Sequence, residues 1–90
     1  MNCSYSLNNA LSVRKVDEEI FILDRSTNVL HSFNGTGAFI WERLQRSDQL
    51  DDIAAAVAAD YEVTPEQVRE DVFDFLLTLE KAHLLTVTCQ

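Results

Sequence analysis

Alternating apolar and polar residues in the first third of the chain predict three short strands. Residues 11–16 alternate well enough for a first strand, and an acidic turn separates them from residues 19–24. The second stretch is apolar on both faces, which is typical of a central or covered strand. A turn then leads into residues 29–33, and Asn28 is the turn residue best able to adopt a positive φ. The pattern therefore predicts an antiparallel three-stranded meander with the second strand in the middle.

The rest of the chain carries helical patterns. A first helix over residues 35–44 begins at a cap formed by Asn34 or Thr36. A second helix covers residues 50–60. Its apolar face consists of Leu50, Ile53, Ala54 and Val57.

The third helix, over residues 65–83, has the clearest start signal in the chain. Thr64 supplies the cap, a proline follows at the first helical position, and Gln67 completes a capping box. The predicted core stripe of this helix consists of Val68, Val72, Phe75, Leu76 and Leu79. Phe73 and Leu77 lie to one side of that stripe. They are either further core residues or a shelf for apolar side chains of a partner.

Length and composition indicate one globular domain over residues 1–90. The apolar share of 47% supports a modest core, which at 90 residues cannot also enclose a large cofactor pocket. We expect residues 1–9 and 86–90 to be frayed. No apolar run approaches the roughly 20 residues of a membrane span, and the N-terminus lacks the basic and apolar regions of a secretory signal. We therefore expect a cytoplasmic protein that does not bind membranes.

The charge balance disfavours several kinds of partner. With 15 acidic and 7 basic residues, the net charge is -8, and such a surface repels phosphate backbones and anionic membranes. The simplest interpretation is that the charge serves solubility. A partner chosen by charge would be neutral or basic.

No constellation of residues points to catalysis, a metal or a cofactor. Cys3 and Cys89 do not have metal-binding spacing, and in a cytoplasmic chain we expect both thiols to be reduced. His31 and His83 stand alone, without a neighbouring nucleophile or orienting acid. The two glycines do not form a phosphate-binding loop. We therefore predict a protein that is not an enzyme and has no metal and no cofactor.

Five short motifs follow one another along the chain. The first covers residues 23–41, from Leu23-Asp24 through the third predicted strand to Trp41. The others are residues 50–53 (LDDI), 61–63 (YEV), 71–76 (DVFDFL) and 84–85 (LL). None is specific alone, but their order and spacing resemble the PqqD-like family, also called the RiPP recognition element. The resemblance covers about residues 13–85.

The resemblance implies an α+β, winged-helix-like fold in which a three-stranded antiparallel sheet is followed by three helices. Family members bind the leader segment of a ribosomally synthesised precursor peptide and present it to a modifying enzyme. The leader adds as a strand to the edge of the third strand, in a groove lined by the third helix. Carried onto this chain, the resemblance implies a peptide-binding site formed by Val29, Leu30, His31, Ser32, Phe33, Arg69, Val72, Phe73, Leu76, Leu77 and Glu80.

The chain departs from the family pattern at three points. Phe33 stands where leucine is usual and Gly37 where alanine is common, and neither change disrupts the implied fold. The proline-glutamate dipeptide that precedes the third strand in pyrroloquinoline quinone members is missing. The implied partner enzyme is therefore of the radical-SAM type or a lasso-peptide protease or cyclase.

Two other functions stay open at this point. The helical order also suits a winged-helix nucleic-acid-binding domain, although a DNA-reading helix should be basic. The third helix has only Arg69 and Lys81 as basic residues, against Glu66, Glu70, Asp71, Asp74 and Glu80. We therefore expect no nucleic acid as a partner. The third possibility is a dimerisation domain, in which the apolar shelf of the third helix joins two copies into a homodimer.

Overall fold

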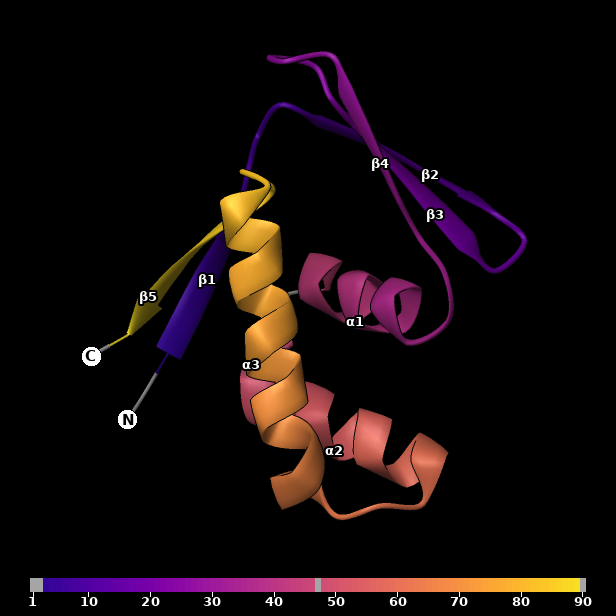
Figure 1. Ribbon diagram of the computed structural model, residues 1–90, viewed down its shortest axis with the longest axis vertical. Helices are drawn as coiled ribbons and strands as arrows, with labels where there is room; N and C mark the ends of the chain where they lie inside the picture. Colours follow the sequence, from indigo (N-terminus) through magenta and orange to yellow (C-terminus); the bar gives the residue numbers. More distant parts are fainter. Residues whose placement is uncertain (1–2, 47, 90) are drawn as a thin grey trace.

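The computed structural model describes residues 3–46 and 48–89, and Figure 1 shows how the elements are arranged. In chain order they are β1 (Cys3–Leu7), β2 (Leu11–Val16), β3 (Glu19–Asp24), β4 (Val29–Phe33), α1 (Gly35–Gln45), α2 (Leu50–Tyr61), α3 (Pro65–Lys81) and β5 (Leu85–Cys89). A three-stranded antiparallel sheet followed by three helices confirms the predicted α+β, winged-helix-like fold class.

The three-stranded sheet has the predicted strand order, β2-β3-β4, with β3 in the middle. In the turn that joins β3 to β4, Asp24 lies opposite Val29. Asn28 adopts a φ of 60°, as predicted, and its N–H donates to the carbonyl oxygen of Asp24 over 2.7 Å. The carboxylate of Asp24 supports the same turn by accepting hydrogen bonds from the N–H and the hydroxyl of Ser26. The turn chemistry therefore determines the register that leads into β4.

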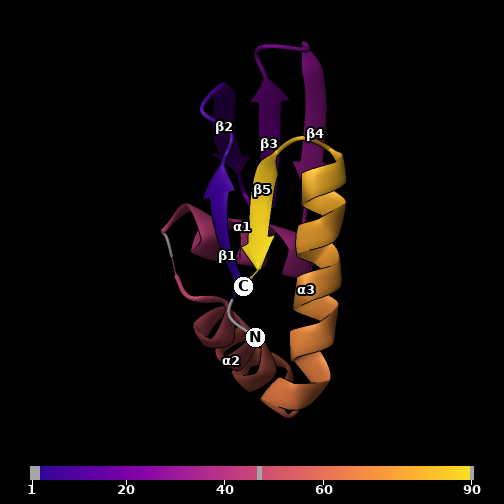
Figure 2. The ribbon, with the colours of Figure 1, turned by 90° about the vertical axis from the view of Figure 1, so that its left-hand side faces the viewer.

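The two ends of the chain form a second sheet instead of fraying. β1 and β5 pair antiparallel over their whole length, from Cys3 opposite Cys89 to Leu7 opposite Leu85. Figure 2 shows this pair with β5 beside α3. The predicted fraying is therefore wrong for residues 3–9 and 86–89, because the two strands pair and Tyr5, Leu7, Leu85 and Val87 pack in or against the core. Residues 1, 2 and 90 of that prediction lie outside the described residues.

A disulfide joins Cys3 to Cys89, so the expectation of two reduced thiols is also wrong. The pairing of β1 with β5 places their Cα atoms 4.0 Å apart. The Tyr5 hydroxyl also anchors β1, sharing its proton between the carbonyl oxygens of Leu44 (3.2 Å) and Asp48 (2.7 Å). Burial and the nearby Asp48 carboxylate raise the pKa of Tyr5.

The helices match the predicted bounds to within two residues. α1 and α2 each extend one residue further than predicted, and α3 ends two residues earlier, at Lys81. Glu62 and His83 adopt positive φ values of 57° and 64° just after α2 and α3. The predicted capping box at the start of α3 is present. Asn34, and not Thr36, is the N-cap of α1, and it makes no side-chain capping hydrogen bond.

One hydrophobic core lies between the three helices and the inner face of the three-stranded sheet. Its largest fully buried side chains are Ile20, Ile22, Trp41, Leu44, Ile53, Leu76, Leu79 and Leu84. Among the described residues, no helix is both long enough and apolar enough to span a bilayer.

Candidate functional site

β4 has a free edge within the described part of the chain, because it is the outermost strand in the order β2-β3-β4. Proteins commonly guard such an edge with proline, lysine or a covering element. The β4 sequence, VLHSF, contains neither proline nor lysine. Val29 and Leu30 leave 47% and 62% of their surfaces exposed. The edge can therefore both donate and accept backbone hydrogen bonds in a ladder with another extended segment.

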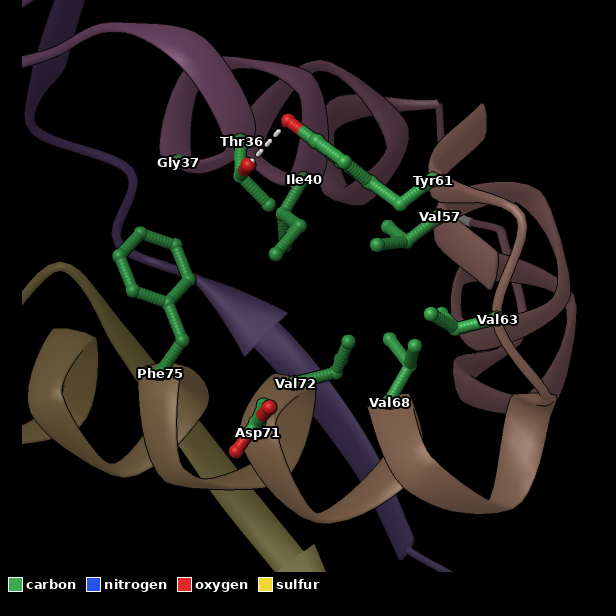
Figure 3. A pocket seen from close by; sticks show the side chains of 10 residues that line it. All are labelled: Thr36, Gly37, Ile40, Val57, Tyr61, Val63, Val68, Asp71, Val72 and Phe75. Atoms are coloured by element: carbon green, nitrogen blue, oxygen red, sulfur yellow. Dashed lines mark hydrogen bonds between the residues drawn. The ribbon is translucent and has the colours of Figure 1, made fainter. Parts of the chain in front are cut away.

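An apolar cavity of about 360 Å³ lies among α1, the end of α2 and the first half of α3 (Figure 3). It is lined by Thr36, Gly37, Ile40, Val57, Tyr61, Val63, Val68, Asp71, Val72 and Phe75. The rings of Phe33 and Phe75 meet edge to face, with centroids 5.4 Å apart. Since Phe33 ends β4 and Phe75 lines the cavity, a segment paired with β4 would meet the cavity as it passes Phe33.

The polar lining residues are at least partly exposed. The hydroxyls of Thr36 and Tyr61 form a hydrogen bond that joins the first turn of α1 to the last residue of α2, as Figure 3 shows. Asp71 is the one charged side chain among the lining residues. The cavity is therefore suited to an apolar side chain, with polar groups near its mouth.

Seven of the predicted site residues lie on β4 or in the core. The five residues of β4 follow its free edge, with His31 and Phe33 partly buried. Val72 and Leu76 are core residues, exposed by only 2% and 0%. Val72 also lines the cavity, whereas Leu76 does not.

The other four predicted residues do not face β4. The carboxylate of Glu80 accepts a hydrogen bond from a backbone N–H of β5 over 2.8 Å. Arg69 and Phe73 border a hollow beside Cys3 of β1, and Leu77 follows Phe73 by one helical turn. These residues therefore lie on or near the flank of α3 that faces the second sheet. The structure does not bring them together with the β4 edge.

Phe75 differs from its predicted role as a core residue. The other members of the predicted stripe are buried, namely Val68, Val72, Leu76 and Leu79. Phe75 is only partly buried and contributes to the cavity wall. The helical pattern could not predict the contact of Phe75 with Phe33, because Phe33 belongs to a strand far away in the sequence.

Most of the cavity lining was missed by the sequence analysis. The side chains from α1, α2 and the segment before α3 include Ile40, Val57, Tyr61 and Val63. Each of these residues fits the pattern of a helix or a connecting segment, so the local sequence does not predict that it lines a cavity. Gly37, where the family commonly has alanine, was the one local indication of the cavity. Its missing side chain leaves room beside Phe33 and Phe75.

The fold and this site together define a winged-helix-like domain with an open strand edge and an adjoining apolar cavity. The family model described as Coenzyme PQQ synthesis protein D (PqqD) matches residues 19–85. The chain therefore belongs to the PqqD family, which confirms the resemblance seen in the sequence.

Two solved structures are similar to this chain over most of their length. TbiB1 in complex with the TbiA(beta) leader peptide is 28% identical, with a TM-score of 0.83, and the match covers 88% of this chain and 92% of that one. Lasso peptide synthetase B1 complexed with the leader peptide is 23% identical, with a TM-score of 0.83 and coverage of 92% and 98%. The second likeness shows the fold alone. No curated protein sequence matches the chain.

Proposed function

We propose that this chain binds the leader segment of a ribosomally synthesised precursor peptide and presents the precursor to a modifying enzyme. The leader adds as a strand to the free edge of β4. The observation that carries the proposal is the continuity between that edge and the apolar cavity, through Phe33 and Phe75. Family membership supports it, as does the leader peptide named in the TbiB1 complex.

An antiparallel leader would meet the site in a defined order. Antiparallel pairing places upstream leader residues opposite Phe33 and downstream residues opposite Val29. The cavity then takes an apolar side chain upstream of the paired segment. In this arrangement Phe75, and not Phe73, is the aromatic wall of the groove.

The proposed role is that of a non-catalytic partner protein. We infer that the modifying enzyme is a lasso-peptide protease or cyclase, with a radical-SAM enzyme as the alternative. The fold is shared with lasso peptide synthetase B1, and the missing proline-glutamate dipeptide disfavours the pyrroloquinoline quinone pathway. We place the encounter in the cytoplasm, because ribosomally synthesised precursors are made there.

Proline substitutions in β4 test strand addition. Proline removes one backbone donor, and only one of the neighbours Leu30 and His31 directs its N–H to the free edge. We expect that variant to lose leader binding while keeping its fold, whereas the other should mainly lose stability. Binding is measured by titrating the 15N-labelled chain with the synthetic leader of a candidate precursor, and folding by circular dichroism. Strand addition at β4 is refuted if both variants fold and bind as tightly as the original chain.

Two phenylalanines of α3 form a matched pair for the cavity. Phe75→Ala removes a wall of the cavity and the contact with Phe33, so leader affinity should fall about tenfold or more, as for other interface anchors. Phe73→Ala should lower the thermal stability but leave the affinity near its original value, because Phe73 lies on the flank beside Cys3. Equal losses of affinity would contradict the proposed groove.

A further inference from the structure

Negative charge gathers at the mouth of the apolar cavity. Asp71 is exposed and lies along α3 between Val68 and Phe75, as Figure 3 shows. Within the described residues, no ion pair engages its carboxylate, since the three ion pairs there involve other residues. The carboxylate is therefore available to a group that enters the cavity.

The C-terminal end of α2 contributes to the same mouth. Tyr61, the last residue of α2, and Val63 both line the cavity. The last turn of α2 has no basic residue. A helix C-terminus carries partial negative charge, which lysine or arginine commonly offsets. Here that partial charge and the Asp71 carboxylate both favour a cation at the mouth of the cavity.

We propose that the bound peptide carries a lysine or arginine within two residues of the apolar side chain that fills the cavity. Its cation lies between Asp71 and the C-terminal end of α2. The inference rests on the proposed leader-binding function and names the residue type that the site selects. Alternate residues of an extended peptide lie about 7 Å apart on one face, a distance that a long basic side chain spans. The net charge of -8 adds long-range attraction for a basic peptide.

The experiment begins with an unbiased set of ligands. A library of random 15-residue peptides displayed on mRNA is selected on the immobilised full chain, and the enriched sequences are aligned on their apolar anchor. The tightest binder is synthesised twice, once as selected and once with its basic residue replaced by norleucine, which keeps an apolar chain without the charge. Affinities are measured by fluorescence anisotropy for the original chain, Asp71→Asn and Glu70→Gln. Glu70→Gln is the matched control, since it removes one negative charge from the same helix beside Cys3 and Phe73.

The proposal expects basic residues to be enriched within two positions of the anchor. Asp71→Asn should weaken binding of the basic peptide roughly two- to fivefold, the scale of an exposed ion pair. It should leave binding of the norleucine peptide unchanged, and Glu70→Gln should change neither affinity.

Other outcomes overturn the inference in distinguishable ways. An alignment without basic enrichment, or equal losses for the two variants, refutes the selection of a cation while leaving strand addition intact. Selected peptides that do not perturb the β4 amides in 15N spectra refute the proposed leader-binding mode itself, and this inference with it.

Discussion

Two glycines two residues apart in α1 should respond to alanine with opposite signs. Gly37 lies in the helix, and an added Cβ would stand 3.4 Å from Phe75 Cζ and 3.5 Å from Phe33 Cβ, which are ordinary van der Waals contacts. Replacing a helical glycine by alanine reduces the backbone entropy lost on folding, so Gly37→Ala should stabilise the chain by about 0.5–1 kcal/mol. For a domain of this size that corresponds to a rise in Tm of about 2–8 °C.

Gly35 lies at the start of the same helix, where the backbone conformation and not the available space limits the substitution. No atom lies within 4 Å of its added Cβ, but its φ is +56°. The left-handed conformation costs an L-residue about 1–2 kcal/mol, so Gly35→Ala should destabilise the chain by that amount despite the open space. Gly35→Asn should cost less, because asparagine tolerates this conformation.

Urea unfolding followed by tryptophan fluorescence measures both effects with one probe. Trp41 is the only tryptophan and is fully buried, so its emission reports loss of the core. The midpoint should move in opposite directions for the two alanine variants, with an unchanged slope. A destabilised Gly37→Ala variant would show that Phe33 and Phe75 leave no room for the methyl group. A Gly35→Ala variant as stable as the original chain would refute the left-handed backbone there.

Two further predictions concern Asp24 and the disulfide. The hydroxyl of Ser26 holds the pKa of the Asp24 carboxyl below its usual range, although burial opposes this. A lowered folded-state pKa stabilises the fold above the unfolded-state pKa, and this contribution is lost as the pH falls through the folded-state value, from about pH 5 downward. Urea midpoints of Asp24→Asn should therefore fall less steeply with acid than those of the original chain, and an equal slope would contradict this. Replacing both Cys3 and Cys89 by serine should lower the free energy of unfolding by about 2–4 kcal/mol, because the bond links residues 86 positions apart. A reducing agent should destabilise the original chain similarly, but not the double variant, and no response to reduction would show that the bond is not formed.

Local signals determined much of this fold from the sequence alone. The alternation in residues 11–33 and the positive φ of Asn28 depend on neighbours within the hairpins, and both predictions are confirmed. The capping box at Thr64 depends on four consecutive residues, and it too is present. The free edge of β4 followed from the strand order, and the family followed from the order and spacing of short motifs.

The tertiary structure alone decided which flank of α3 faces the candidate site. Phe73 and Phe75 lie two positions apart, which is about 200° around a helix. Periodicity placed Phe75 in the core stripe and Phe73 beside it, but it could not identify the neighbours of either ring. β5 packs on the Phe73 flank, and β4 reaches the Phe75 flank through Phe33. The pairing of β1 with β5 and the Cys3–Cys89 bond are decided in the same way. These contacts join segments far apart in sequence, and their partners become neighbours only when the whole core closes.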